Sequence, residues 1–359
     1  MESKKRIRLL SFTSIILLIG VAIIVFIADP FFHYHVPWLG LQAVPDIKEY
    51  QIPGILDNFE YDGILVGSSV VVSIDTDILE ERFDCRVVKA TANSAPAAQL
   101  NDYLNRAFDS HELKYVFYGL DAFSLYTDPE MKLYDENLEY IVNRNPFDDV
   151  KYLWNMDILG EKIPNMIGRT KAGIGPRGTM FTINSQMETG ADKVLAVYCP
   201  NAKAIPEVKQ SNYMETEVEE NIQRIEKHIN EHPETEFLFM IPPYNILWWD
   251  NAYEQGMFEN YMCSLEKCIG QLLEYDNVHI YTTDFNEPKI IEDMDNYMDC
   301  IHGNPSVTKR MALQVGVPEN EVTKETYRKE IEKLRSLEYG FRERIVEENL
   351  EFIYEGPWD

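Results

Sequence analysis

Apolar and polar positions alternate in blocks over most of the chain, and the block lengths predict strands and helices in turn. Short apolar runs that end in glycine, proline or small polar residues lie at 62–69, 85–94, 111–123, 236–241 and 278–284. Longer segments between them have a helical period, as in Val218, Ile222, Ile225 and Ile229. This alternation is typical of a parallel sheet covered by helices on both faces. We therefore expect the α/β class, with a three-layer α/β/α sandwich and a mainly parallel sheet.

The amino-terminal 28 residues have a different pattern. Residues 1–8 hold a cluster of basic side chains, and residues 9–28 hold no charged residue. A helix of about 20 residues reaches roughly 30 Å, the thickness of a bilayer core. The following sequence, DPFFHYHVPW, has no small-residue cleavage site of the signal-peptide type. We expect an uncleaved transmembrane signal anchor, with the carboxyl-terminal domain extracytoplasmic. A cleaved signal peptide and a buried helix are the alternatives.

These patterns divide the chain into five segments. We predict a cytoplasmic basic flank (1–8), the anchor (9–28), an extracellular aromatic linker (29–59), an α/β domain (60–317) and a charged helical tail (318–359). Between about 130 and 210 the alternation stops, and the sequence is rich in aromatic, asparagine and glycine residues. We interpret this stretch as an insertion near the functional face of the domain.

Charge and cysteine content exclude some classes of function. The formal net charge is -27, although the first eight residues are basic. A protein with this much negative charge is unsuited to binding the phosphates of nucleic acid. Five cysteines in 359 residues do not form a disulfide framework, and their spacing does not match a zinc site. We expect no metal or organic cofactor.

Polar residues follow the predicted strands at the point where each strand ends. They are Ser68, Ser69, Asn93, Ser94, Asp121, Tyr244, Asp284 and the pair Asp299 and His302. The carboxyl ends of parallel strands meet at one edge of a sheet, which is where such folds place their ligands. The sequence therefore predicts a functional site at this edge.

Two serines and an Asp-x-x-His pair suggest nucleophilic catalysis. Ser68 and Ser69 follow Gly67 at the end of a strand, where backbone N–H groups at a helix start can hold negative charge. Late in the chain, His302 could take a serine proton while Asp299 orients the imidazole. Each signal alone is also compatible with an ordinary turn. Together they occur in the order serine, aspartate, histidine.

At these residues the chain resembles the SGNH hydrolases, which are GDSL-type esterases and acyltransferases with a flavodoxin-like fold. VGSSV (66–70) is similar to the first family block, and MDCIH (298–302) is similar to the last. IPPY (241–244) and ADPFFHY (28–34) resemble the membrane-anchored members that act in teichoic-acid D-alanylation and alginate O-acetylation. The resemblance implies Ser69 as nucleophile, His302 as base and Asp299 as its partner.

The middle family blocks differ from this sequence. The glycine of the second block is missing, and Asn93 and Ser94 are its nearest equivalents. Asp121 occupies the place of the asparagine donor in the third block. Because an ionised carboxylate cannot donate a hydrogen bond, Asp121 must be protonated, turned away or used for another purpose. We assign Ser68, Asn93, Ser94, Asp121 and Tyr244 to the oxyanion and substrate region, with Asn93 as a substitute side-chain donor.

The resemblance implies a membrane-anchored extracytoplasmic serine esterase or O-acyltransferase. Its expected partners are the membrane, a cell-surface polysaccharide or acyl donor, and a membrane acyltransferase; nucleic acid is not among them. The alternative is a non-catalytic surface protein of the same fold that binds envelope glycan or an assembly partner. Tyr244, Trp248 and Trp249 would then form a sugar platform, unless these rings pack the loop itself.

Overall fold

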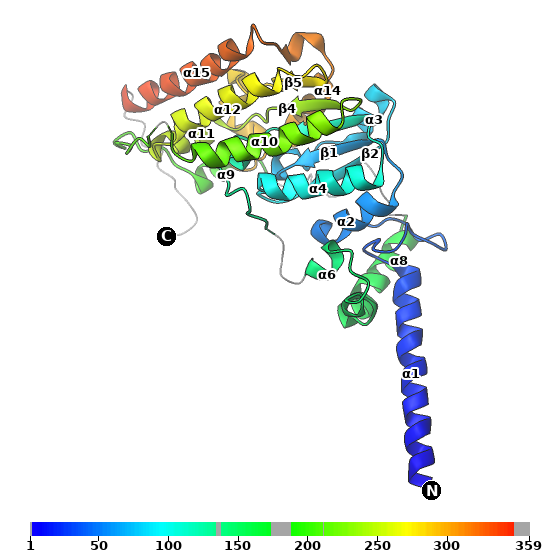
Figure 1. Ribbon diagram of the computed structural model, residues 1–359. Helices are drawn as coiled ribbons and strands as arrows, with labels where there is room; N and C mark the ends of the chain where they lie inside the picture. The colour runs from blue at the N-terminus through cyan, green and yellow to red at the C-terminus, as the bar shows by residue number, and fades with distance from the viewer. Residues whose placement is uncertain (1, 134–137, 174–187, 211, 348–359) are drawn as a thin grey trace, which may run out of the picture. The chain divides into compact units, whose positions relative to one another are not determined.

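The chain folds into two compact units. The computed structural model describes residues 2–133, 138–173, 188–210 and 212–347 (Figure 1). One unit combines residues 1–60 with 134–181, and the other combines 61–133 with 182–359. The glycine-rich part of the predicted insertion (174–187) and the end of the predicted tail (348–359) lie outside the described residues.

The second unit is built on a six-stranded sheet. Its strands are β1 (Gly63–Gly67), β2 (Val87–Thr91), β3 (Tyr115–Gly119), β4 (Glu236–Met240), β5 (Val278–Tyr281) and β6 (Glu321–Val322). Their order is β2-β1-β3-β4-β5-β6, with every pair parallel except β5 and β6. The predicted α/β class with a mainly parallel sheet is confirmed.

Amphipathic helices connect the strands of this unit. They are α3 (Thr76–Phe83), α4 (Ala97–Ser110), α5 (Ala122–Leu125), α9 (Ala191–Val197), α10 (Glu215–Glu231), α11 (Ile246–Glu254), α12 (Phe258–Leu272), α13 (Pro288–Ile291), α14 (Pro305–Gln314) and α15 (Tyr327–Glu347). Short 3-10 turns η1 (Ser69–Val71), η4 (Met294–Asn296) and η5 (Pro318–Asn320) complete it. Helix α4 packs against β1 and β2, and α3 packs against β2. Helix α10 buries the four apolar residues whose period predicted it.

The segment predicted as a charged tail belongs to the folded unit. It begins with η5, and the next two residues form β6, which pairs antiparallel with β5. Helix α15 then packs against α11 and α12 and buries Ile331, Leu334 and Ile345. Although this segment is densely charged, its apolar residues form a stripe along α15 that covers part of the core.

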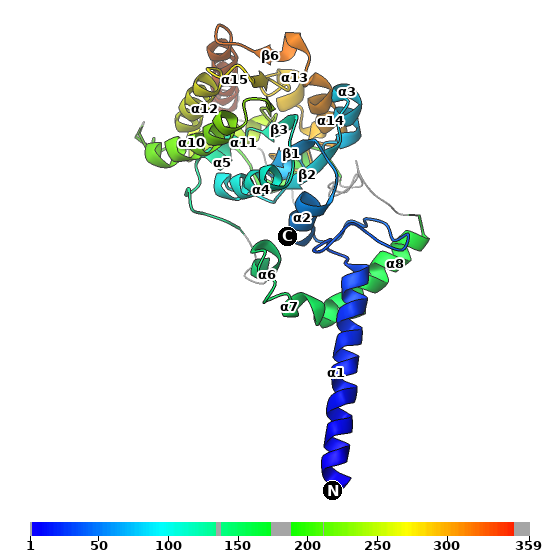
Figure 2. The same cartoon turned by 45° about the vertical axis from the view of Figure 1, so that its right-hand side comes forward.

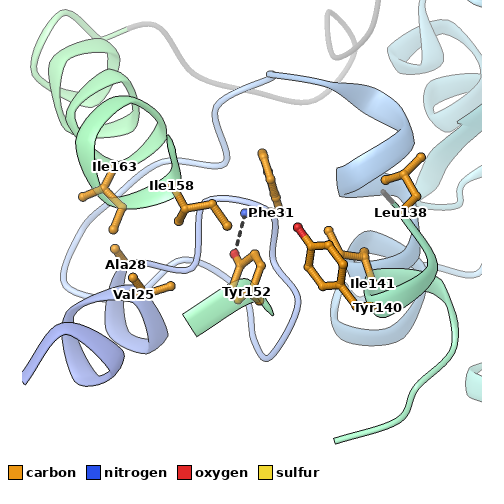
Figure 3. Packing of buried hydrophobic residues seen from close by; sticks show 9 residues of the cluster. All are labelled: Val25, Ala28, Phe31, Leu138, Tyr140, Ile141, Tyr152, Ile158 and Ile163. Atoms are coloured by element: carbon orange, nitrogen blue, oxygen red, sulfur yellow. Dashed lines mark hydrogen bonds between the residues drawn. The ribbon is translucent and has the colours of Figure 1, made fainter. Parts of the chain in front are cut away.

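The first unit contains α1 (Glu2–Ala28), α2 (Lys48–Asn58), α6 (Glu139–Val142), α7 (Val150–Leu153), the π-helix η3 (Ile158–Lys162) and α8 (Ile163–Lys171). Within α1, Ser3–Ala28 is long and apolar enough to cross a membrane. The other end of α1 joins a small core, drawn in Figure 3, that contains Val25, Ala28, Phe31, Leu138, Tyr140, Ile141, Tyr152, Ile158 and Ile163. Part of the predicted insertion therefore folds with the predicted linker.

Candidate active site

The turn that carries Ser69 is fixed by two glycines and one valine. A Cβ on Gly67, the last residue of β1, would lie 2.6 Å from Cγ2 of Val71. A Cβ on Gly119, the last residue of the neighbouring β3, would lie 2.7 Å from Cγ1 of the same valine. Both separations are shorter than real Cβ contacts. Val71 therefore occupies the space above the two strand ends that the glycines leave, and this packing sets where η1 begins.

The loop that carries His302 is closed by main-chain pairing. Tyr297 and Gly303 form an antiparallel bridge, and the N–H of Met298 donates to the carbonyl oxygen of His302 at 3.0 Å. The fully buried Tyr297 donates its hydroxyl to the carbonyl oxygen of Pro243 at 2.9 Å. The loop is thus attached to the segment that follows β4.

Asp299 both shapes this loop and holds the imidazole. Its Oδ1 accepts the N–H groups of Ile301 at 2.8 Å and His302 at 2.7 Å. Its Oδ2 lies 2.6 Å from Nδ1 of His302. Burial alone would raise the pKa of Asp299, but the hydrogen bonds and charge of His302 and the N–H of Ile301 together hold it below the ordinary value. Asp299 is therefore an anion at neutral pH.

His302 joins this carboxylate to Ser69. Because Nδ1–H of His302 donates a hydrogen bond to the anionic Asp299, Nε2 is the acceptor nitrogen, and it lies 2.8 Å from Oγ of Ser69. Ser69, Asp299 and His302 are all partly exposed. The serine hydroxyl is thus hydrogen-bonded to a base that a carboxylate orients, which is the arrangement that activates a serine nucleophile.

Ser68 makes a separate, buried network. Its hydroxyl donates to Oδ2 of Asp121 at 2.7 Å, while Oδ1 of Asp121 accepts the N–H of Phe123 at 2.9 Å and the hydroxyl of Tyr244. Ser68, Asp121 and Tyr244 are at most 3% exposed. Burial, followed by the charge of Asp121, raises the pKa of Tyr244 well above 10, so the phenol remains a donor.

In the hydrogen bonds of the described residues, Asp121 accepts from the hydroxyls of Ser68 and Tyr244 and from the N–H of Phe123. The structure therefore gives Asp121 a purpose other than oxyanion donor: it holds Ser68, Tyr244 and the start of α5 in place. Ser68 and Tyr244 have hydroxyls that bond to this carboxylate and are not presented to solvent.

Asn93 and Ser94 lie exposed just after β2. Gly67 pairs with Thr91 across β1 and β2, so these residues follow the paired position as Ser68 and Ser69 do. Ser94 has a positive φ of 49°. In the part of the chain that the structure describes, the N–H groups of Ser69 and Ser94 make no backbone hydrogen bond of their own. They lie past the same ends of adjacent strands as the serine hydroxyl.

The sugar platform considered for the aromatic residues is not present in this form. Tyr244 and Trp249 are only 2% and 1% exposed, and Trp248 is half-buried. The ring centroid of Tyr244 lies 4.6 Å from that of Trp248 and 5.7 Å from that of Trp249. These rings pack the segment between β4 and α11, because their large apolar faces fill the space beside the buried network.

Some positioning residues were missed from the sequence. Lys89 lies buried on β2, and its Nζ donates to the carbonyl oxygen of Val72, directly after η1, at 3.0 Å. Burial lowers the pKa of Lys89 to about 8. The hydroxyl of Thr308 on α14 contacts the carbonyl oxygen of Ser73 at 3.3 Å. The sequence signal for Lys89 was its position inside the apolar run VVKAT (87–91).

Among the described residues, no group of three or more histidine, cysteine, aspartate or glutamate side chains is placed to hold a metal ion. No family model matches the chain, and no curated protein matches it either.

Proposed function

We propose that this chain is a membrane-anchored, extracytoplasmic serine esterase or O-acyltransferase of the SGNH type. Its substrates would be acyl esters of a cell-envelope polysaccharide. The observation that carries the proposal is the continuous hydrogen-bonded series Ser69–His302–Asp299, whose serine and histidine are 233 positions apart. A buried packing role does not account for it, because all three side chains are partly exposed at the strand ends. The family's three-layer, flavodoxin-like sandwich is part of the same proposal.

In the proposed reaction, Oγ of Ser69 attacks the ester carbonyl while Nε2 of His302 takes the hydroxyl proton. Asp299 keeps Nδ1 protonated and stabilises the imidazolium that forms. The N–H groups of Ser69 and Ser94 would hold the oxyanion, with Asn93 as a further donor. His302 then protonates the leaving alcohol, and an acyl-enzyme on Ser69 remains.

The acyl-enzyme is released in a second attack with His302 again as base. The attacking group is water in an esterase or a glycan hydroxyl in an acyltransferase. Location favours an envelope polymer, because α1 is long enough to span a bilayer and its basic end would remain in the cytoplasm. The acyl donor or a membrane acyltransferase would supply the acyl group on the outer side.

Labelling with a fluorophosphonate probe tests the proposal. The full-length protein in detergent should be used, because Val25 and Ala28 of α1 belong to the core of the first unit. We expect the adduct on Ser69, its loss in His302→Ala and its retention in the matched control Ser68→Ala. A folded protein that takes no label, or takes it at another residue, would refute the mechanism.

A further inference from the structure

A second element of the first unit lies against the membrane-length helix. Nε1 of Trp154, directly after α7, donates to the carbonyl oxygen of Leu18 in α1 at 2.8 Å. Val21 is partly buried against the core that includes Ile158 of η3. Figure 2 shows α7 beside the carboxyl-terminal half of α1. These contacts tie the stretch that contains α7 and η3 to the carboxyl-terminal half of α1, which also exposes the apolar side chains of Leu17, Ile19 and Ile23.

The depth of this contact is informative. Leu18 precedes Ala28, the end of α1, by a distance of roughly 15 Å along the helix axis. If α1 spans a bilayer, its carboxyl end reaches the outer interface and the carbonyl of Leu18 lies within the hydrocarbon core. The Trp154 side chain reaches toward that level, so α7 and η3 must lie lower than the end of α1. Interfacial elements rest about 5–10 Å into the boundary between headgroups and acyl chains.

The same stretch exposes large apolar side chains. Their exposed fractions are 88% for Phe147, 52% for Val150, 38% for Trp154, 71% for Met156 and 37% for Ile167. We propose that residues 147–167, here termed the interfacial segment, lie in the outer headgroup region of a phospholipid bilayer with these side chains toward the acyl chains. The apolar surface of α1 continues directly into this segment, which is why lipid is its occupant.

Charges of the interfacial segment set how deep it lies. Asp149 pairs with His33 at 3.1 Å, and Lys162 pairs with Asp46 at 3.0 Å, so these charges are compensated within the unit. Lys151, Asp157 and Glu161 are exposed and would be costly in hydrocarbon, so their charged ends must extend to the headgroups while the Trp154 side chain reaches toward the acyl chains. The inference rests on the membrane insertion in the proposed function and not on its ester chemistry.

The test uses the full-length protein in phosphatidylcholine vesicles, with or without brominated acyl chains. Phe147→Trp and Met156→Trp each add one fluorophore at an exposed position of the interfacial segment. Ile205→Trp is the matched control, because Ile205 is 95% exposed and belongs to the other unit. We expect the fluorescence added at 147 and 156 to be blue-shifted, lost with brominated lipid and resistant to aqueous iodide. The fluorescence added at 205 should not be blue-shifted, should be unaffected by brominated lipid and should be quenched by aqueous iodide.

Iodide quenching at 147 and 156 without quenching by brominated lipid would overturn the inference, because these side chains would then face water. Flotation of the parent protein with the vesicles tests α1 separately. A protein that does not float refutes the anchor and this inference together. One that floats with its 147 and 156 probes in water refutes this inference only. Fluorophosphonate labelling of Ser69 reports on the ester chemistry in either case.

Discussion

Two adjacent serines have opposite environments in this fold. Ser69 is partly exposed and hydrogen-bonded to an imidazole whose other nitrogen faces Asp299. Ser68 is buried and donates to Asp121, which also accepts a hydrogen bond from the hydroxyl of Tyr244. Both networks contain a serine, a carboxylate and an aromatic side chain with a polar group. Only the network of Ser69 contains an imidazole beside the serine and is partly exposed.

The difference shows that the partner, and not the residue type, gives a serine its chemistry. A hydroxyl bonded to a carboxylate in a buried site stabilises the loop and stays protonated. A hydroxyl bonded to a neutral imidazole can lose its proton as it attacks. The Ser68 network thus supports the turn, and the Ser69 network is the one we expect to react.

Replacing each serine by alanine should give the largest contrast. Ser69→Ala should lower kcat for a small acyl ester by at least about 10⁴-fold, because the nucleophile is lost. Ser68→Ala should keep kcat within about tenfold and destabilise the fold by about 1–3 kcal/mol, because Oδ2 of Asp121 loses its donor in a buried site. Ester hydrolysis and urea unfolding measure the two effects. Equal loss of kcat in both variants would contradict the separation of the networks.

Replacing each aspartate by asparagine should give the next largest contrast. In Asp299→Asn the amide would favour the wrong imidazole tautomer, and kcat should fall by about 10⁴-fold in a protein that still folds. In Asp121→Asn an N–H must face one of three donors, so we expect a loss of about 1–3 kcal/mol in stability and a minor change in kcat. Steady-state kinetics and denaturant titration separate these outcomes. An Asp299→Asn enzyme of normal activity would disprove the assigned role.

Removing the phenol tests the buried network in isolation. Tyr244→Phe deletes one donor to Asp121 and leaves the ring packing with Trp248 and Trp249 unchanged. We expect a loss of about 1–2 kcal/mol in the free energy of unfolding and an unchanged KM. Thermal unfolding of the variant beside the parent measures the first. A large rise in KM would instead mean that Tyr244 contacts the substrate.

The two networks should weaken at opposite ends of the pH scale. The pKa of Asp299 is lowered on folding, so its contribution to stability is present above about pH 4 and is lost as the pH falls through the lower, folded value. The pKa of Tyr244 is raised, so its contribution is present below about pH 10 and is lost as the pH rises further. Urea midpoints of Asp299→Asn and Tyr244→Phe should approach the parent at acid and alkaline pH, respectively. If the urea midpoint of each variant differed from that of the parent by the same amount at every pH, these pKa shifts would be contradicted.

The sequence predicted the five parallel strands well because they are short, mainly apolar runs that end in glycine, proline or small polar residues. It also predicted that Ser69, Asp299 and His302 act together, and the structure joins them, although the loop of Asp299 and His302 follows α13 and η4 and not a strand. It could not specify the use of Asp121, because the choice between an oxyanion donor and a buried acceptor depends on Tyr244, which is 123 positions away. Nor could it show that Val71 fits between two glycines of different strands.

The packing of the discontinuous first unit also could not be predicted from local sequence patterns. Its core joins Phe31 to Tyr152 across 121 positions, and each contributing stretch is too short to signal a packed element alone. The predicted linker and insertion were therefore correctly seen as irregular, but their mutual packing depends on contacts that periodicity does not report.

That discontinuity has a consequence for biosynthesis. Residues 1–60 leave the ribosome first, yet their core is complete only when residues 134–181 have followed. At about 5–20 residues per second, synthesis of the intervening residues 61–133 takes roughly 4–15 s. During that interval Asp29, which is buried in the folded unit, still lacks the hydroxyl of Tyr152. The order of translation thus requires the three strands β1, β2 and β3 to emerge before the first unit can close.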